Sequence, residues 1–300
     1  MKKPKIWVTE MLQKVTEPKP AEEPKKPQKK KTSSSTWLLT GVLILGIGFL
    51  LYPTVSDYWN SFHQSRAIAG YVESVTRIDN SEFETLWKDA DAYNASLVYK
   101  DNRYVLSDEE TEQYNSLLNI TDTGIMAYVE IPKIRVSLPI YHGTDEAVLQ
   151  VAIGHIPGSS LPVGGQSTHC VISGHRGLPS ARLFTDIDQL DKGDSFTIQT
   201  LGETLTYEVD QIRTVLPTEL EDIEIAEGQD YVTLVTCTPY GVNSHRLLVR
   251  GHRIANAKDH LHVTPDAVQI SDHITAFILA VLFVLVLLLI SFLQHVFRTH

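Results

Sequence analysis

The chain has little cysteine: among its 300 residues, only Cys170 and Cys237 carry a thiol. Two cysteines are too few for the disulfide framework of a small secreted domain, although they could form one bridge, share a metal ion or include one reactive thiol. Hydrophobic residues make up 43% of the chain and charged residues 21%. These shares are ordinary for a folded protein of one sizeable domain or two modest ones.

Positive charge is scarce in the middle of the chain. Residues 36–273 hold 15 basic and 32 acidic side chains, a net charge of −17. Such an acidic body is repelled by nucleic acid and by anionic lipid headgroups, so we expect no nucleic-acid partner. Residues 1–35 have the opposite balance, with ten Lys against four Glu. Their Pro-, Lys- and Glu-rich composition cannot bury a core and predicts a disordered basic tail.

Charged residues are missing altogether from two apolar runs that bracket the acidic body. The first, 36–52, would span about 26 Å as a helix. Trp37 and Tyr52 lie at its two ends, where aromatic rings favour the membrane interface, and Pro53 is expected to stop the helix. The second, 274–293, has twenty residues, enough to cross a bilayer. We therefore expect two transmembrane helices.

The flanking charges predict how the chain crosses the membrane. Five lysines lie between residues 25 and 31, and Arg298 follows the second run. Positive residues stay on the cytoplasmic side, so the tails 1–35 and 294–300 are expected in the cytoplasm and residues 54–273 outside the cell. A signal peptide is the alternative for the first run, but no small-x-small cleavage site follows it.

Between the runs, residues 53–123 have a helical pattern, with apolar side chains three and four residues apart. A Ser followed by a Glu three residues later is typical of a helix capping box. Ser81 with Glu84 predicts the start of a helix reaching Leu97, and Ser107 with Glu110 predicts a second helix start.

From Gly124 to residue 256 the sequence instead has short β-rich runs separated by Gly, Pro and Asp. Many short strands without long helices between them predict a β-barrel or a sandwich. Residues 257–273 would link this domain to the second apolar run. The expected strands are Ala127–Ile131, Leu138–Tyr141, Cys170–Ser173, Ser195–Thr200, Thr204–Val209, Gln211–Val215, Tyr231–Thr236 and Arg246–Arg250.

Cys237 lies at the end of one expected strand, where Pro239 prevents its extension. A thiol in that place is exposed on one side and held rigidly on the other, as a catalytic nucleophile must be. Arg246 opens the next strand, and a hairpin of that length would bring its guanidinium beside the thiol. The guanidinium would stabilise a thiolate and offer hydrogen-bond donors to an oxyanion. His175 follows a third strand, which suits an acid/base group.

Each of these residues has an ordinary structural explanation when taken alone: a buried thiol, a solvated loop histidine, a surface arginine. The combination of TLVTC, Arg246 and an upstream SGHRG resembles the sortase signature. Further stretches resemble the class C, pilus-assembling sortases of Gram-positive bacteria, over roughly residues 55–290. They are EIPKIRVSLPIYHGT, GHIPGSSLPVGG, SGHRGLPSARLF and LVTCTPYGVNSHRLLVRGHR, followed by a C-terminal apolar anchor.

The resemblance implies an eight-stranded β-barrel with N-terminal helices, flanked by two transmembrane helices and held outside the cell membrane. It further implies that Cys237 attacks an LPXTG-like sorting signal of a pilin and forms a thioester. His175 would act as acid and base, and Arg246 would hold the signal and the oxyanion. A lysine of the next pilin would then take over the acyl group. A thioester conserves the peptide-bond energy, so no cofactor is required.

Several alternatives stay open at this point. Cys170 and Cys237 could form a disulfide, and the adjacent His169 and Cys170 could contribute to a zinc site, although neighbours on a strand point to opposite faces. Four aspartates could attract calcium, although their order does not match the EF-hand pattern. They are Asp186, Asp188, Asp191 and Asp194.

Two other functions fit parts of the sequence. A housekeeping sortase that attaches proteins to peptidoglycan would use the same residues, but usually has one anchor. A two-span membrane ectodomain without catalysis would explain the topology but not the signature residues.

The chain also lacks the Asp-Pro-aromatic tripeptide with which class C sortases cover their cysteine. Asp101 and Tyr104 could form a looser plug, with the carboxylate on Arg246 and the ring over Cys237, so we expect an open or weakly closed site.

Overall fold

The computed structural model describes residues 34–256, 280, 281 and 284. The chain divides into two units, Met1–Leu43 with Leu279–His300, and Ile44–Ile278. The expected linker 257–273 and tail 294–300 lie outside the described residues, as do most of the basic tail 1–35 and nearly all of the apolar run 274–293. The folded domain is in the second unit.

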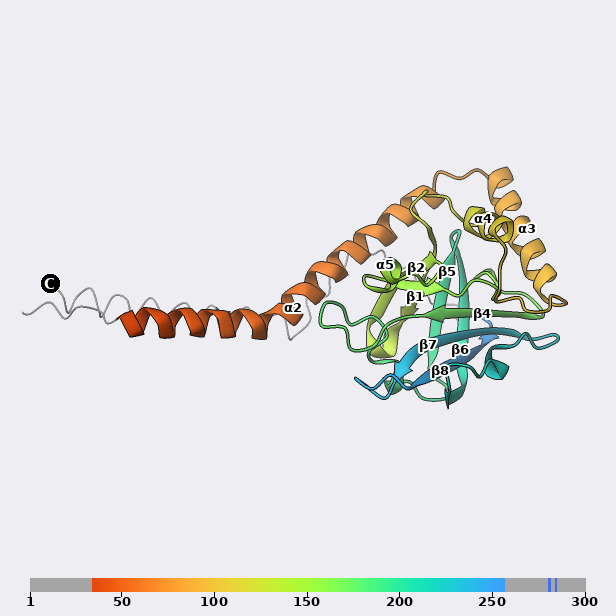
Figure 1. Cartoon of the computed structure of the whole chain (residues 1–300). Helices are drawn as coiled ribbons and strands as arrows, with labels where there is room; N and C mark the ends of the chain where they lie inside the picture. Colours follow the sequence, from red (N-terminus) through yellow and green to blue (C-terminus); the bar gives the residue numbers. More distant parts are fainter. Residues whose placement is uncertain (1–33, 257–279, 282–283, 285–300) are drawn as a thin grey trace, which may run out of the picture. The chain divides into compact units, whose positions relative to one another are not determined.

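Eight strands form a closed barrel (Figure 1). All neighbouring strands are antiparallel except two parallel pairs, β2 with β3 and β4 with β7. The short runs after Gly124 predict a barrel or a sandwich, and the structure has the barrel, as the family resemblance implies. In hydrogen-bonded order the strands are β1 (Ile125–Ile131), β2 (Val136–His142), β3 (Ile153–His155), β4 (Thr168–Ser173), β7 (Asp230–Thr238), β8 (His245–Ile254), β6 (Glu203–Val215) and β5 (Ser195–Thr200), which pairs back to β1.

The strands differ from the prediction in two places: one pair of predicted strands is a single strand, and one strand has no predicted counterpart. The runs 204–209 and 211–215 belong to the single strand β6, whose pairing with β8 shifts at Asp210. A bulge accommodates the extra residue without ending the strand. The Asp210 carboxylate accepts hydrogen bonds from Arg250 Nε (3.0 Å) and Nη2 (2.9 Å) on β8. Strand β3 was not predicted, because three residues are too few to show an alternating pattern.

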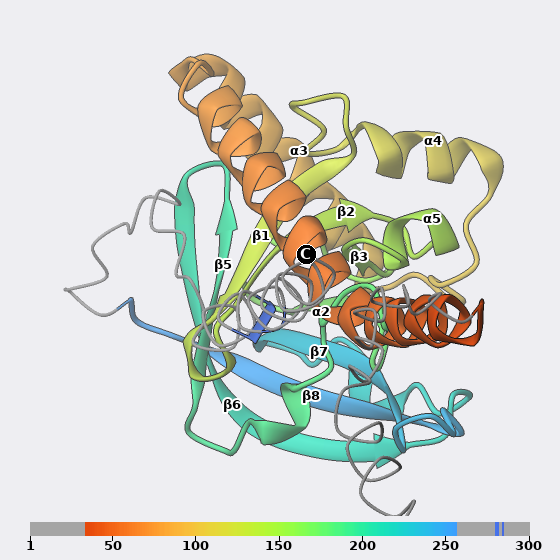
Figure 2. The ribbon, with the colours of Figure 1, turned by 90° about the vertical axis from the view of Figure 1, so that its left-hand side faces the viewer.

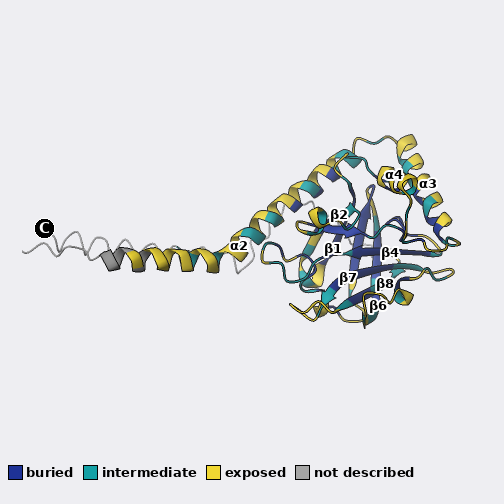
Figure 3. Ribbon diagram, in the orientation of Figure 1, coloured by how far each residue is buried: buried dark blue, intermediate teal, exposed yellow. Residues whose placement is uncertain are grey.

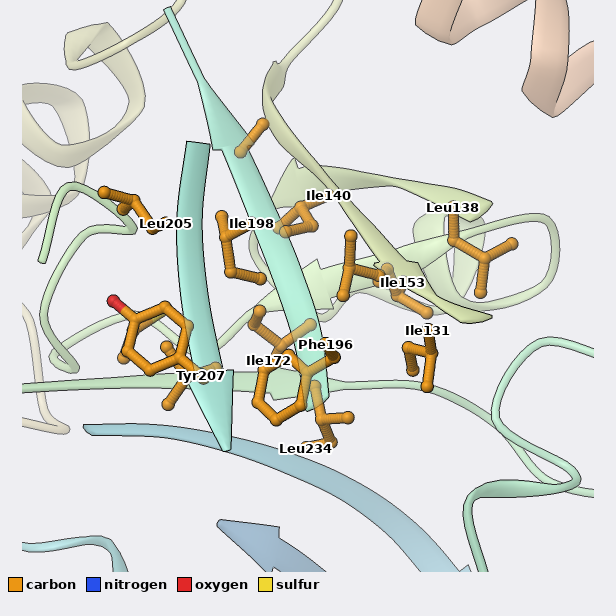
Figure 4. Packing of buried hydrophobic residues seen from close by; sticks show 14 of the residues in the cluster. Ile131, Leu138, Ile140, Ile153, Ile172, Phe196, Ile198, Leu205, Tyr207 and Leu234 are labelled. Atoms are coloured by element: carbon orange, nitrogen blue, oxygen red, sulfur yellow. The ribbon is translucent and has the colours of Figure 1, made fainter. Parts of the chain in front are cut away.

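The barrel interior is filled by large apolar side chains from nearly every strand (Figure 4). Phe196 on β5 and Tyr207 on β6 stack with their ring centroids 5.7 Å apart. Burying each such side chain contributes about 1.5–3 kcal/mol to folding. The strands are accordingly mostly buried, whereas the outer faces of the helices are exposed (Figure 3). A core of this kind holds the strand ends in fixed positions.

Helices α3 (Asn80–Leu97) and α4 (Asp108–Ser116) lie together beside the barrel (Figure 1). The capping box of Ser107 and Glu110 is present at the start of α4, as predicted. The predicted helix reaching Leu97 is confirmed as α3, but its predicted cap is wrong: the cap is Asp79, whose carboxylate accepts hydrogen bonds from the backbone of Ser81 and Glu82. Short helices complete the unit: η1 (Pro132–Ile134), α5 (Glu146–Leu149), η2 (Ile187–Gln189) and η3 (Glu221–Ile223).

Helix α2 (Ser34–Val75) contains the first apolar run. The prediction that this helix stops at Pro53 is wrong, because Pro53 lies inside α2. Its segment Gly41–Val75 is long and apolar enough to cross a membrane, and it is the one such helix among the described residues. The C-terminal part packs on β1 (Figure 2), where Ile68 and Tyr71 bury against Ile125 and Tyr128. Pro53 has no backbone N–H, so the helix continues through it with one hydrogen bond fewer.

Candidate active site

Cys237 and Arg246 are directly opposed in the antiparallel pair β7–β8. Strand β7 ends at Thr238, just before Pro239, and β8 begins at His245, so the hairpin returns the arginine to the cysteine as its length predicts. Side chains of opposed residues point to the same face of a sheet, with Cβ atoms about 4.5–5.5 Å apart. Cys237 is half-buried.

His175 reaches the same end of the barrel through β4, the parallel neighbour of β7. Ser173 pairs with Val235, and beyond it the Gly174 N–H donates to the Val235 carbonyl (3.0 Å). The Thr236 hydroxyl in turn donates to the Gly174 carbonyl (2.8 Å). His175 follows two residues after Ser173, and Cys237 two residues after Val235. The three residues that the sequence predicts for the site therefore lie at the same end of the barrel, at the ends of neighbouring strands.

Gly174 must be a glycine for this arrangement. A Cβ at this position would lie 2.7 Å from the Phe184 ring and 2.8 Å from Ile153. Both neighbours are fully buried and cannot move away. The glycine thus lets β4 approach the core closely just before the histidine.

The guanidinium of Arg246 is anchored on the β7–β8 turn. Its Nη1 donates to the carbonyls of Asn243 (3.2 Å) and His245 (3.1 Å). Arginine has five N–H donors in a fixed fork, and among the described residues Nε and Nη2 of Arg246 donate to no group, so these donors can serve a ligand. The anchored guanidinium can present them at a fixed position beside the thiol.

An apolar cavity of about 150 Å³ adjoins Arg246. It lies between the ends of β4, β6, β7 and β8 and the β6–β7 loop (216–229). A wall of aliphatic side chains with one cation at its edge suits an extended peptide that has an aliphatic side chain and a reactive carbonyl. The lining residues are Ile156, Ser173, Val215, Leu216, Pro217, Glu219, Leu220, Ile223, Val235, Arg246 and Leu248.

Residues 98–106 lie against this β6–β7 loop. Both Arg103 Nη2 (3.2 Å) and the Tyr104 hydroxyl (3.1 Å) donate to the Ile223 carbonyl. The Arg103 guanidinium, which is buried, also pairs with Glu224 at 2.8 Å. In the described part of the chain, Asp101 forms no ion pair with Arg246. The contact that Asp101 could have made with Arg246 is thus absent from the described residues, and Arg103 and Tyr104 brace the loop that walls the cavity.

The second cysteine is remote from the first. Cys170 pairs with Val232, five residues from Cys237 along β7, which corresponds to about 16 Å. That separation excludes a disulfide, and both thiols are free. Burial raises the pKa of the Cys170 thiol, so Cys170 is a packed core residue rather than a nucleophile.

The residues considered for metals are engaged with other groups. His169 Nδ1 contacts the Glu224 carbonyl (2.8 Å) and Nε2 the Thr233 hydroxyl (2.7 Å). Among the described residues, no group of three or more His, Cys, Asp or Glu side chains is placed to hold a metal ion. The four aspartates of the calcium alternative pair with cations: Asp186 with Arg182, Asp188 with Arg176, and Asp191 and Asp194 with Lys133.

A larger cavity of about 500 Å³ lies elsewhere in the barrel. Asp230, at the start of β7, lines it together with Trp87 and Arg253. Cys237 is seven residues further along the strand, or about 23 Å away. Size alone would favour this cavity, but none of the three signature residues lines it, so we place the chemistry at the smaller one.

Comparison with known proteins agrees with this geometry. Residues 129–254 match the family model of the sortase domain. Sortase C1 from Streptococcus agalactiae, a crystal structure, is 54% identical, with a TM-score of 0.63, covering 64% of this chain and 100% of that one. Sortase C of Streptococcus pneumoniae is 45% identical, with a TM-score of 0.57 over 64% and 97% of the two chains. The sortase A of Streptococcus agalactiae serotype III (strain NEM316) is 25% identical over 206 residues, 67% of this chain and 78% of its own.

The family match and the similar solved structures identify this closed barrel as a sortase fold. The chain belongs to the sortase family, whose members are cysteine transpeptidases, and its neighbours among solved structures are class C sortases. The barrel with N-terminal helices is thereby established. Of the two expected membrane helices, the first lies in α2, which is long and apolar enough to cross a membrane, and nearly all of the second lies outside the described residues.

Proposed function

We propose that this protein polymerises pilins, using Cys237, His175 and Arg246. The thiolate of Cys237 attacks the carbonyl carbon between Thr and Gly of an LPXTG-like sorting signal. The C–N bond breaks, the Gly amine leaves with a proton from His175, and a thioester remains on the sulfur. A lysine amine of the next pilin then attacks the thioester, gives its proton to His175 and releases the thiolate. One amide bond is exchanged for another, so the reaction needs no energy source.

The observation that carries the proposal is the opposition of Cys237 to Arg246, which lines an apolar cavity. The free donors of the anchored guanidinium suit the oxyanion that develops when the thiolate attacks, because such donors act most strongly where they are fixed in advance. The aliphatic wall suits the Leu-Pro part of a sorting signal.

Pilins are favoured as substrates by the similarity to class C sortases. One of these, from Streptococcus pneumoniae, is described in terms of its pilin substrate specificity. We further propose that the protein sits in the cell membrane with two spans and exposes its barrel outside the cell. The apolar segment of α2 and the charges around both apolar runs support this topology.

The test is to incubate the full-length protein with candidate pilins and to identify the cross-linked residues by mass spectrometry. We expect an isopeptide bond between the sorting-signal threonine and a pilin lysine, absent with Cys237→Ala. Attachment to a peptidoglycan precursor instead would assign the protein to the housekeeping sortases. A thiol at Cys237 that is inert to alkylating reagents would favour a non-catalytic ectodomain.

A further inference from the structure

The loop that follows His175 is closed at its base. The His175 carbonyl accepts a hydrogen bond from the Phe184 N–H (3.2 Å), and the Gly177 N–H donates to the Thr185 hydroxyl (3.1 Å). Phe184 is fully buried in the barrel core. Residues 175–184 thus form a loop whose two ends meet at the backbone of the histidine. How the rest of this loop is held therefore affects where the imidazole lies.

The tip of the loop is held by helix α2. The Asp57 carboxylate accepts a hydrogen bond from the Arg182 N–H (2.8 Å), and Asn60 Nδ2 donates to the Ser180 carbonyl (2.8 Å). Asp57 and Asn60 are three residues apart, and so lie on the same face of the helix. Ala181, between the two bonded residues, is buried. Both contacts satisfy backbone groups that the loop itself leaves unpaired.

The charged side chains of the loop do not replace these contacts. Arg182 pairs with Asp186, and Arg176 pairs with Asp188, so both ion pairs join the loop to residues that immediately follow it. They stiffen the loop locally but do not join it to α2. Ala181 and Leu183 pack the loop on the barrel core, and Asp57 and Asn60 tie its backbone to α2.

We propose that Asp57 and Asn60 are positioning residues for His175, so that α2 keeps the imidazole alongside Cys237. The inference rests on the proposed role of His175 as the acid and base. Asp57 and Asn60 follow Tyr52, the end of the apolar run, by five and eight residues, or about 8 and 12 Å along the helix. The helix that contains the candidate membrane segment therefore also holds the loop of the proposed acid/base.

The experiment uses full-length protein in lipid nanodiscs and a fluorogenic LPXTG peptide, with kcat and KM measured separately. The double substitution Asp57→Ala with Asn60→Ala should lower kcat about tenfold or more, because small misplacements of a reacting group are costly. KM should change less than about twofold, since the peptide cavity is untouched. The single substitution Asp57→Asn should keep most of kcat, because the amide oxygen of the new asparagine can still accept a hydrogen bond from the Arg182 N–H.

The matched control is Gln64→Ala. Gln64 Nε2 also joins α2 to the barrel, by donating to the Val151 carbonyl (2.6 Å), but it does not contact the His175 loop. This variant should keep kcat. Hydrogen exchange gives a readout without catalysis: the amides of Arg182 and Phe184 should exchange faster in the double variant and not in Gln64→Ala.

The outcomes separate the two proposals. Unchanged kcat in the double variant, or an equal loss with Gln64→Ala, would overturn the positioning role. Unchanged exchange at Arg182 and Phe184 would show that α2 does not hold the loop. Wild-type turnover in His175→Ala would instead overturn the acid/base role of His175, and the exchange data would still decide whether α2 holds the loop.

Discussion

Cys237 on β7 and Arg246 on β8 are cross-strand partners, and the residue two places beyond the paired part of β4 is His175. Cys237 and Arg246 stand on neighbouring strands, and His175 begins the loop that follows β4, the neighbour of β7 on its other side. Backbone hydrogen bonds and the packed interior therefore fix the positions of Cys237 and Arg246. Sites built on such strands hold their groups more accurately than sites on loops do.

The two cysteines should respond differently to substitution. Cys237→Ala should abolish peptide cleavage and pilin joining, because no other described thiol lies near Arg246. Cys170→Ala should leave most of the activity, because burial raises the pKa of this thiol and the residue serves only packing. Turnover of a sorting-signal peptide checks both. Equal losses in the two variants would contradict the assignment of the nucleophile.

Arg246→Lys should lower turnover well over tenfold. Lysine keeps the charge but loses the planar fork, and one missing oxyanion donor typically costs about 10²–10³ in rate. Arg213→Lys is the control, because Arg213 is a largely exposed arginine on β6. Near-normal turnover in Arg246→Lys would show that a diffuse positive charge is sufficient.

Arg103→Ala should weaken peptide binding. The substitution removes the donor to the Ile223 carbonyl and the ion pair with Glu224, and so loosens the loop that walls the cavity. We expect KM for the sorting-signal peptide to rise several-fold, and about 1.5–3 kcal/mol of stability to be lost with a buried charged hydrogen bond. Asp101→Ala is the comparison. In the Asp101→Ala variant, Cys237 should be alkylated at the same rate as in the unmodified protein. A large acceleration would show that Asp101 does help to cover the thiol.

Stability should fall between pH 6.5 and pH 4. Burial lowers the pKa of His155 and of His169 from 6.5 to about 4, so both remain neutral when folded while the unfolded chain takes up protons. Their contribution is complete above pH 6.5 and is lost as the pH falls towards 4, by at most about 3 kcal/mol for each histidine. Urea midpoints across this range measure it. His169→Gln should give a shallower slope than the exposed control His63→Gln, and identical slopes would contradict the account.

The sequence predicted what depends on local pattern and on a hairpin of fixed length. Alternation and punctuation located the strands around Cys237 and Arg246, and the capping box located α4. Contacts between distant segments left no such pattern. Asp57 and Asn60 meet residues 120 and more positions away, and Arg103 meets Ile223 at a similar separation. The bulge at Asp210 and the continuation of α2 through Pro53 are likewise not marked by any local pattern.

The most direct test of the central claim is to trap the acyl-enzyme. The full-length protein is mixed with a sorting-signal peptide, quenched in acid, digested and analysed by mass spectrometry. The account predicts that the fragment ending in threonine is attached to Cys237 as a thioester, and that an added lysine amine removes it. Product formation without any adduct on Cys237, or an adduct on another residue, would contradict the account.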